Sequence, residues 1–229
     1  MNTVVYADFS CPACYLASLR VDRLLDAGRP VPDWRGVEHK PRLPVTGIRL
    51  ESSARAARGR ELAEVRALLG PGEELPAAAP GILPNTRAAV AAYAYAEAYG
   101  AGVAQLVRPL LFHSYWVDGM DIGDPEVLRR LLPDAFRQGG RTSDPIRDFG
   151  YAVTSQRGPI TTDAHRRIRS WHQDWLALGT GVVLALVTDS TTLVGGLALA
   201  HLTESARSYR PVAPEPRPRS GSPVLVPQP

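Results

Sequence analysis

The feature that most constrains the fold is the position of the two cysteines, three residues apart at the end of a predicted strand. Residues 3–9 read TVVYADF, and these β-branched and aromatic side chains are typical of a strand. Small and apolar residues then recur at Cys14, Ala17, Val21 and Leu24. Spacings of three and four place them on one face of a helix. The cysteine pair therefore stands where a strand passes into a helix.

A second strand follows the predicted helix. Gly28 and Pro30 are expected to end the helix, and residues 33–41 (DWRGVEHKP) form a strand that Pro41 closes. The first forty residues therefore predict a strand–helix–strand unit.

The remaining chain is predicted to be helical in the middle and mixed at the end. Residues 48–155 are expected to be helical throughout, with Asp-Pro pairs at 124–125 and 144–145 beginning two of the helices. Pro109 predicts a kink or a boundary. The last expected elements are a helix, two strands and a helix, over residues 161–178, 182–187, 191–195 and 196–209.

This order predicts an α/β fold, the thioredoxin fold with an inserted all-helical domain. The thioredoxin-like domain would comprise residues 1–47 and 156–209, and the helical insertion residues 48–155. Seven of the twenty residues in 210–229 are proline. We expect that tail to be disordered, because its composition cannot bury enough apolar surface to fold.

Composition excludes several classes of protein. Apolar residues make up 45% and charged residues 21% of the 229, which is typical of a globular protein. No run of 18 apolar residues occurs, so no membrane span is expected. The basic residues are 25 arginines and the single Lys40, but the net charge is only +3 and no arginine stripe alternates with aromatics. We therefore expect no nucleic-acid partner.

The first residues contain no charged segment followed by a long apolar run, so a cytoplasmic location is expected. In that reducing compartment a permanent structural disulfide is not expected. The cysteine pair is then predicted to carry redox, catalytic or metal chemistry.

The position of Cys11 favours a reactive thiol. A sulfur at the first turn of a helix meets unpaired backbone N–H groups, which lower its pKa below the free value of about 8.5. Pro12 suits the first helical position, since it has no N–H to satisfy. Cys11 would attack, and Cys14, on the inward face, would resolve the mixed disulfide.

The cysteine pair has two other interpretations, a structural one and a metal site. The cysteines could be two ordinary buried residues, although a C-x-x-C beside a strand–helix–strand unit is typical of redox proteins. A zinc site would need four ligands, and no second C-x-x-C or H-x-x-x-H exists. We expect neither a metal nor a cofactor, with metal or iron–sulfur binding shared between two chains as a minor alternative.

The sequence resembles the DsbA-like thioredoxin-fold proteins, in the cytoplasmic branch called dithiol-disulfide isomerases. Residues 3–205 carry the resemblance, most specifically in YADFSCPACYLAS and LLFHSYWVDGMDIGDPEVLRRLL. It implies thiol–disulfide exchange by Cys11 and Cys14, with the flanking residues Pro12, Ala13 and Tyr15. In relatives the second segment faces the cysteine cleft, so His113 is a cleft candidate.

The sequence departs from that family at two places. The dipeptide between the cysteines is often Pro-His; here it is Pro12-Ala13, so Cys11 lacks an imidazole and is expected to be a weaker oxidant. Relatives also carry a cis-proline before the third strand. No proline occurs between residues 159 and 211, and Gly181 is expected at that position, in a trans peptide. The loop candidates are therefore Thr180, Gly181 and Val182.

Three functions remain open. The first is a thiol–disulfide oxidoreductase or isomerase acting on protein or small-molecule disulfides and thiols. The second is a glutathione-dependent isomerase or transferase of the kappa or hydroxychromene-carboxylate type, which usually has serine where Cys11 stands. The third is a thioredoxin-fold module that binds a partner without catalysis. A homodimer is plausible for the fold.

Overall fold

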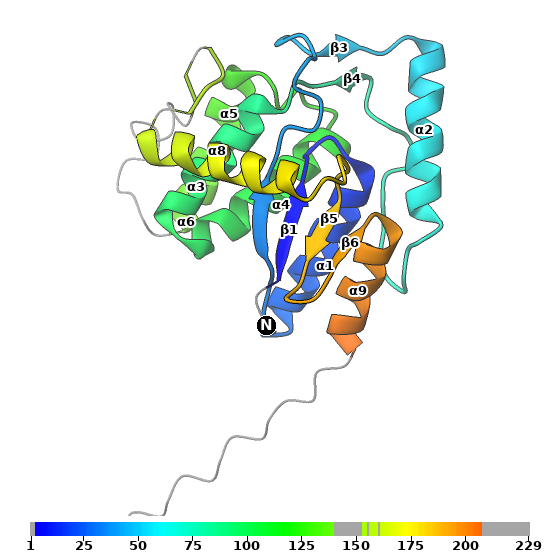
Figure 1. The fold of residues 1–229 in the computed structure, drawn as a ribbon. Coiled ribbons are helices and arrows are strands. Elements are labelled where there is room, and N and C mark those ends of the chain that lie inside the picture. Colours follow the sequence, from blue (N-terminus) through cyan, green and yellow to red (C-terminus); the bar gives the residue numbers. More distant parts are fainter. Residues whose placement is uncertain (1–2, 140–152, 155, 160, 208–229) are drawn as a thin grey trace, which may run out of the picture.

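A four-stranded sheet in the order β2-β1-β5-β6 forms the centre of the molecule (Figure 1). The computed structural model describes residues 3–139, 153–154, 156–159 and 161–207. β1 pairs in parallel with β2 and antiparallel with β5, and β5 pairs antiparallel with β6. The strands are β1 (Val4–Ala7), β2 (Asp33–Gly36), β5 (Ala185–Val187) and β6 (Thr192–Val194).

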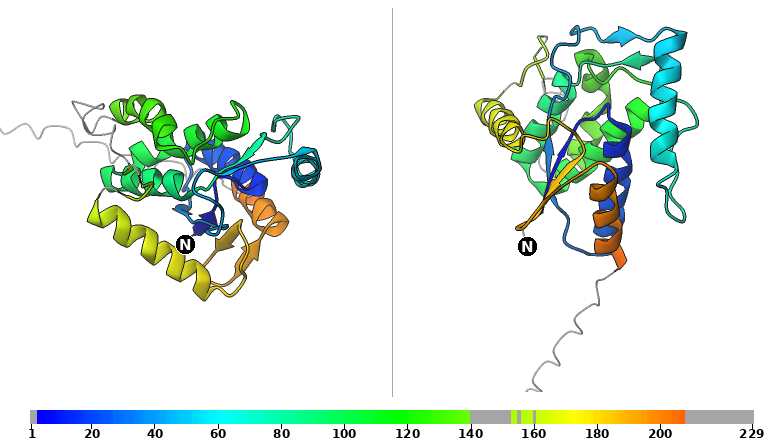
Figure 2. Two further views of the ribbon diagram at one scale, coloured as in Figure 1. Left: turned by 90° about the horizontal axis from the view of Figure 1, so that it is seen from above. Right: turned by 45° about the vertical axis from the view of Figure 1, so that its right-hand side comes forward.

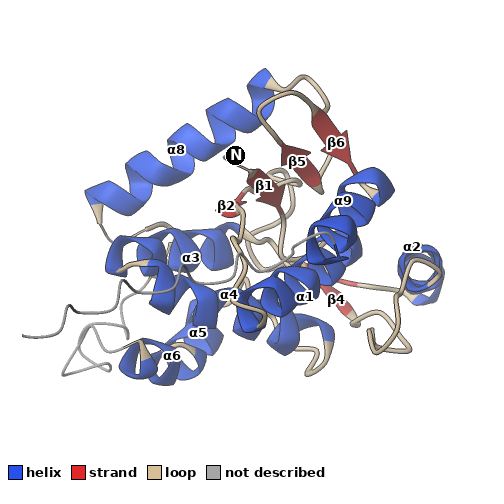
Figure 3. Cartoon of the chain, turned by 90° about the horizontal axis from the view of Figure 1, so that it is seen from below, coloured by secondary structure: helices blue, strands red, loops and turns tan. Residues whose placement is uncertain are grey.

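Helices cover both faces of this sheet. α1 (Pro12–Asp26) and α9 (Gly196–Arg207) pack together on one face, and α8 (Thr162–Ala177) crosses the other (Figures 2 and 3). Each of these helices turns its apolar residues toward the strands, where Val5, Leu16 and Leu186 are completely buried. The connection β1–α1–β2 and the pair β5–β6 with α9 are the two halves expected from the sequence, so the predicted thioredoxin fold is confirmed.

The inserted helices lie beside the sheet and against α1. α3 packs on α8, α4 and β2, whereas α4 and α2 both contact α1. In Figure 1 α2 stands on the opposite side of α1 from α3, α5 and α6. The helices are α2 (Ser52–Arg66), α3 (Arg87–Tyr99), α4 (Ala101–Trp116), α5 (Pro125–Leu131) and α6 (Pro133–Gln138).

The insertion differs in two details from its expected form. It contains two short strands, β3 (Ile48–Arg49) and β4 (Ile82–Leu83), which pair antiparallel, so it is not helical throughout. α4 continues through Pro109, so of the kink or boundary expected at this proline the boundary is excluded. The element expected to begin at the Asp-Pro pair 144–145 and the proline-rich tail lie outside the described residues.

Arg108, a buried residue of α4, connects the insertion to α1 by hydrogen bonds. Its guanidinium donates to the Ser18 carbonyl at 2.8 Å and to the Asp22 carboxylate at 2.5 Å, and it lies 5.2 Å from the centre of the Trp34 ring. A buried guanidinium is tolerated only where its N–H groups find such partners. The position of α1 is thus fixed jointly by the sheet and by α4.

Among the described residues, no helix combines the length and the apolar character needed to cross a membrane.

The central strand should dominate stability. We expect Leu186→Ala to lower the free energy of unfolding by about 2–5 kcal/mol, because it leaves a cavity in the sheet core. Leu176→Ala on α8, whose side chain is 56% exposed, should change it by less than about 0.5 kcal/mol. Urea denaturation followed by circular dichroism measures both, and equal effects would contradict the assigned core.

Candidate functional site

The two cysteines lie at the start of α1, immediately after β1. Cys11 is the N-cap residue, in extended conformation, and Pro12 occupies the first helical position. The Cys11 N–H donates to the Asp8 carbonyl at 3.1 Å, which closes a tight turn between strand and helix. This turn points the Cys11 sulfur at the unpaired N–H groups of the first helical turn. The backbone N–H groups of Ala13 and Cys14 act on that sulfur and lower the pKa of Cys11.

The two thiols have opposite electrostatic environments. Cys11 is partly exposed and Cys14 is completely buried. A hydrogen bond from the Cys14 thiol lowers the pKa of Cys11; the backbone N–H groups act in the same direction, while burial and the Asp8 charge oppose them. Burial raises the pKa of Cys14 well above its ordinary value, as does its proximity to Cys11. These environments favour the thiolate form of Cys11 and the thiol form of Cys14.

The loop before β5 lies opposite Cys11. The Val183 carbonyl oxygen is 3.8 Å from the Cys11 sulfur, and the Val183–Leu184 peptide bond is cis. Trp175 of α8 holds this loop by donating its indole N–H to the Val182 carbonyl at 2.9 Å.

The expectation that Gly181 stands opposite the cysteines is therefore corrected, because Val183 does. Gly181 has a φ of +61° and is exposed, with open space around it. It belongs to the turn that leads into the loop, as do Thr180 and Val182. None of the three lines the cavity beside Cys11. The sequence marks the true position only weakly, since a cis bond before leucine has no signature.

Asp8 is a buried carboxylate at the end of β1. Only 1% of the residue is exposed, so it is not a solvated loop carboxylate. Its Oδ1 accepts from the Ser10 N–H and hydroxyl, both at 2.7 Å, and its Oδ2 accepts from the His39 N–H at 2.8 Å and the Thr86 hydroxyl at 2.9 Å. Asp8 thereby connects the cysteine turn to the chain after β2 and to the start of α3.

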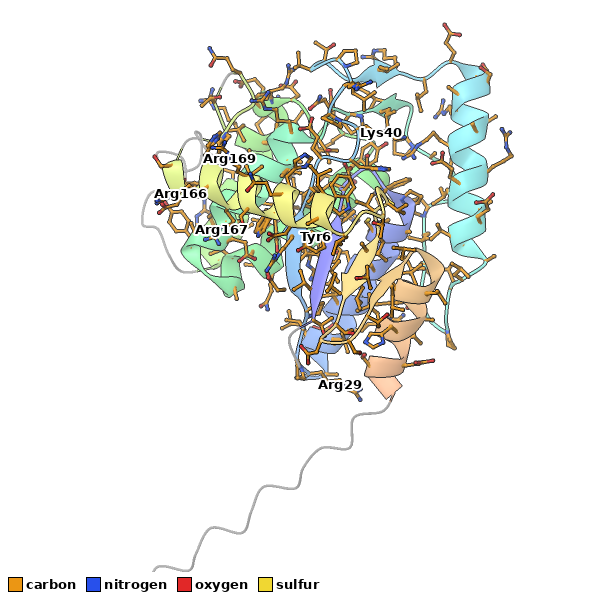
Figure 4. All side chains as sticks on the ribbon, viewed as in Figure 1. Tyr6, Arg29, Lys40, Arg166, Arg167 and Arg169 are labelled. Carbon is orange, nitrogen blue, oxygen red and sulfur yellow. The ribbon has the colours of Figure 1, made fainter. Side chains whose placement is uncertain are left out.

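A cavity of about 290 Å³ opens beside Cys11, between the cysteine turn and α2. The inserted helix α2 supplies Arg58, Glu61 and Glu64 to its wall, while His39 and Lys40 come from the chain after β2. Figure 4 labels Lys40 in the region between α8 and α2. The cavity therefore lies between the thioredoxin-like part of the chain and its insertion.

Arg58 is the functional-site residue that the sequence did not reveal. It is only 8% exposed, donates to the Ser10 carbonyl at 2.5 Å and lies 5.5 Å from the centre of the Trp116 ring. Its Nε finds no hydrogen-bond partner within the described residues. The Arg58 guanidinium of the inserted helix α2 thus contacts Ser10, the residue before Cys11, and helps to position the cysteine turn.

Two predicted candidates lie away from this cavity. Tyr15 is buried and stacks on Phe112 and Trp116, with ring centres 5.7 and 6.2 Å away, so it belongs to the core rather than to the cavity wall. His113 lies on the outer side of α4 with 57% of its side chain exposed, and its Nε2 is 3.7 Å from an Asp118 carboxylate oxygen. Neither lines the cavity beside Cys11.

Solved structures share this fold across nearly the whole chain. A probable DsbA oxidoreductase from Streptomyces coelicolor matches with a TM-score of 0.62 and 16% identity, over 93% of each chain. The cytosolic disulfide reductase DsbM from Pseudomonas aeruginosa, solved with GSH, matches with a TM-score of 0.63 and 15% identity over 90% of this chain and 96% of its own. A 2-hydroxychromene-2-carboxylate isomerase matches at 0.59 and 18% identity, over 90% and 94%.

No curated protein sequence matches the chain. At the identities found, the solved structures establish the fold alone. The family model for the DSBA-like thioredoxin domain, in contrast, matches residues 3–135, which is more than half of the chain and includes both cysteines. The chain belongs to the family of DSBA-like thioredoxin domains.

Proposed function

We propose that this chain is a thiol–disulfide oxidoreductase or isomerase, with Cys11 as the nucleophile and Cys14 as the resolving thiol. The observation that carries the proposal is the placement of the pair at the start of α1, where Cys11 is the N-cap residue beside a cavity and Cys14 is completely buried. In this placement the pKa of Cys11 is lowered and that of Cys14 is raised. An exchange reaction needs this division, because the first sulfur must attack as a thiolate while the second stays protonated until its turn.

The reaction follows from the two sulfurs. The Cys11 thiolate attacks a substrate disulfide and forms a mixed disulfide, and the displaced sulfur leaves as a thiolate that takes a proton from solvent. Cys14 then loses its proton and attacks the Cys11 sulfur, which releases the second substrate thiol. The dithiol becomes the Cys11–Cys14 disulfide, and the substrate gains two electrons and two protons. The reverse sequence oxidises a dithiol substrate.

The cavity beside Cys11 sets the direction from which a substrate arrives. The Val183 carbonyl lies 3.8 Å from the sulfur, and Val183 forms part of the cavity wall. Lys40 and Arg58 in the cavity wall stand against Glu61 and Glu64, so the formal charges of the cavity balance apart from His39. We infer that it admits protein disulfides and small thiols of modest charge. Glutathione is the small thiol to test first, because the similar DsbM structure contains it.

We propose a cytoplasmic location, as for that cytosolic relative. We also propose that the chain forms a homodimer. The glutathione-dependent isomerase remains the second candidate, supported by the similarity to the 2-hydroxychromene-2-carboxylate isomerase. A binding module without catalysis is the third. Measurements on the two cysteines separate the first candidate from the other two.

Substitution of each cysteine should have a different effect on exchange. We expect Cys11→Ser to abolish disulfide exchange with insulin or oxidised glutathione, since no attacking thiolate remains. Cys14→Ser should stop at a stable mixed disulfide of Cys11 with glutathione, detectable by intact-mass spectrometry. His113→Ala, altered away from the cavity, should exchange like the wild type. Unchanged exchange in Cys11→Ser would overturn the assigned chemistry.

The lowered pKa of Cys11 should be visible in its reactivity. A lower pKa leaves more thiolate at neutral pH, so the midpoint for iodoacetamide alkylation should fall below the free-thiol value of about 8.5. Cys14→Ala removes the hydrogen bond that contributes most to the lowering, and should move the midpoint upward. Cys14→Ser, which keeps a donor, should move it less. A wild-type midpoint at or above 8.5 would refute the activated thiolate.

Asp8 should oppose thiolate formation. Its charge raises the pKa of Cys11, so Asp8→Asn is expected to shift the alkylation midpoint to lower pH. Asp26→Asn, at the far end of α1, should leave the midpoint unchanged. Because Asp8 accepts four hydrogen bonds, the variant's folding is checked by circular dichroism at each pH. An upward shift in a folded variant would show that Asp8 acts on the thiolate through geometry rather than charge.

A further inference from the structure

A second cavity, of about 350 Å³, lies on the other side of the chain that follows β2. Its walls come from the end of β2, the start of α3 and one side of α8. It shares no lining residue with the cavity beside Cys11. Ligand sites in proteins often occupy such junctions between a sheet and an added domain, and the volume is within the range that small molecules require.

The interior of this second cavity is apolar. Val37 and Val90 are 1% and 2% exposed, and Ile168 of α8 packs against the hydrophobic core beside them. Pro41 and Pro159 extend the apolar wall. A surface of this kind favours the flat or branched hydrocarbon body of a ligand.

The rim of the cavity is basic. Arg87, Arg169, His165 and His172 surround the opening, and Glu38 is the one acidic residue among them. Two guanidinium groups thus face one carboxylate, which leaves a surplus of one positive charge while both imidazoles are neutral. The charge of Arg87 acts on Glu38, so Arg169 supplies the charge that is not compensated within the cavity.

Arg169 differs from the other arginines of α8 in its partners and in the surface that it lines. Arg166 pairs with Asp163 on its own helix. Within the described part of the chain, the Arg169 side chain forms neither a hydrogen bond nor an ion pair. Figure 4 shows Arg169 above α8 and Arg167 below it, and Arg166 and Arg167 line a different surface hollow. Arg169 is therefore available to a ligand in the second cavity.

We propose that this cavity binds a small organic anion with an apolar, preferably aromatic, body. The hydrocarbon part would lie on Val37, Val90 and Ile168, and the acidic group would meet Arg169 and Arg87 at the rim. This site is separate from the cysteine pair, so its occupancy does not depend on the proposed exchange reaction.

The test uses naphthalene-2-sulfonate, which combines an aromatic body with an anionic group. It is titrated into the full chain while NMR follows the imidazole resonances of the five histidines. We expect those of His165 and His172 to shift together with a single dissociation constant, and those of His113 and His201 to stay in place. The neutral naphthalene-2-methanol should bind about tenfold more weakly.

Matched variants on α8 locate the charge. Arg169→Gln should weaken binding of the sulfonate about two- to fivefold, as expected for an exposed ion pair. Arg166→Gln, three residues earlier and outside the cavity, should have no effect, and Cys11→Ser should bind like the wild type. The proposal is overturned if no saturable shift appears at His165 and His172. It is equally overturned if Arg169→Gln and Arg87→Gln both bind the sulfonate with unchanged affinity.

Discussion

The buried carboxylate of Asp8 holds together the segments from which the cysteine site is built. Its four hydrogen bonds reach the turn before α1, the chain after β2 and the first residue before α3. Each of these hydrogen bonds replaces one to water that is lost on burial. Without them, burial of the carboxylate would be strongly unfavourable. The Asp8 carboxylate that orders the turn also places a negative charge near both sulfurs. That charge opposes formation of a thiolate. Donors from α1 and from Cys14 outweigh that charge at Cys11.

The insertion is part of the site rather than an addition to a complete one. Arg58 of α2 binds the carbonyl of Ser10, and Arg108 of α4 binds α1 through Ser18 and Asp22. Both arginines are buried, and each donates from its guanidinium to a backbone carbonyl of the element it joins. The cysteine turn therefore has one support from the sheet and one from the insertion. A thioredoxin core without the inserted helices would lack a wall of the cavity beside Cys11.

The fold and the cysteine pair could be predicted from the sequence because both depend on local patterns. The strand-forming run before Cys11, the helical spacing after it and the later pair of strands are each encoded within short segments. The ends of the strands were less predictable, since β1 stops at Ala7 where the Asp8 side chain begins the turn. Residues 37–41 were likewise expected in the second strand, but β2 ends at Gly36.

The rest of the site depends on contacts between distant segments. Arg58 is one of 25 arginines, and only tertiary packing brings it to Ser10. Val183 was missed because no proline marks this loop in the sequence, and the expected position fell on Gly181 instead. His113 was placed in the cleft by resemblance of its segment, but its own side chain lies on the outer side of α4. A segment can thus keep its place in a fold while an individual side chain faces solvent.

The reduction potential of the Cys11–Cys14 pair tests the account most directly. The protein is equilibrated with glutathione buffers of graded potential, and the fraction of intramolecular disulfide is read by alkylation and mass spectrometry. We expect a reversible two-electron transition within the range of characterised thioredoxin-fold couples, about −270 to −120 mV. Absence of any Cys11–Cys14 disulfide across that range, in a folded protein, would contradict it.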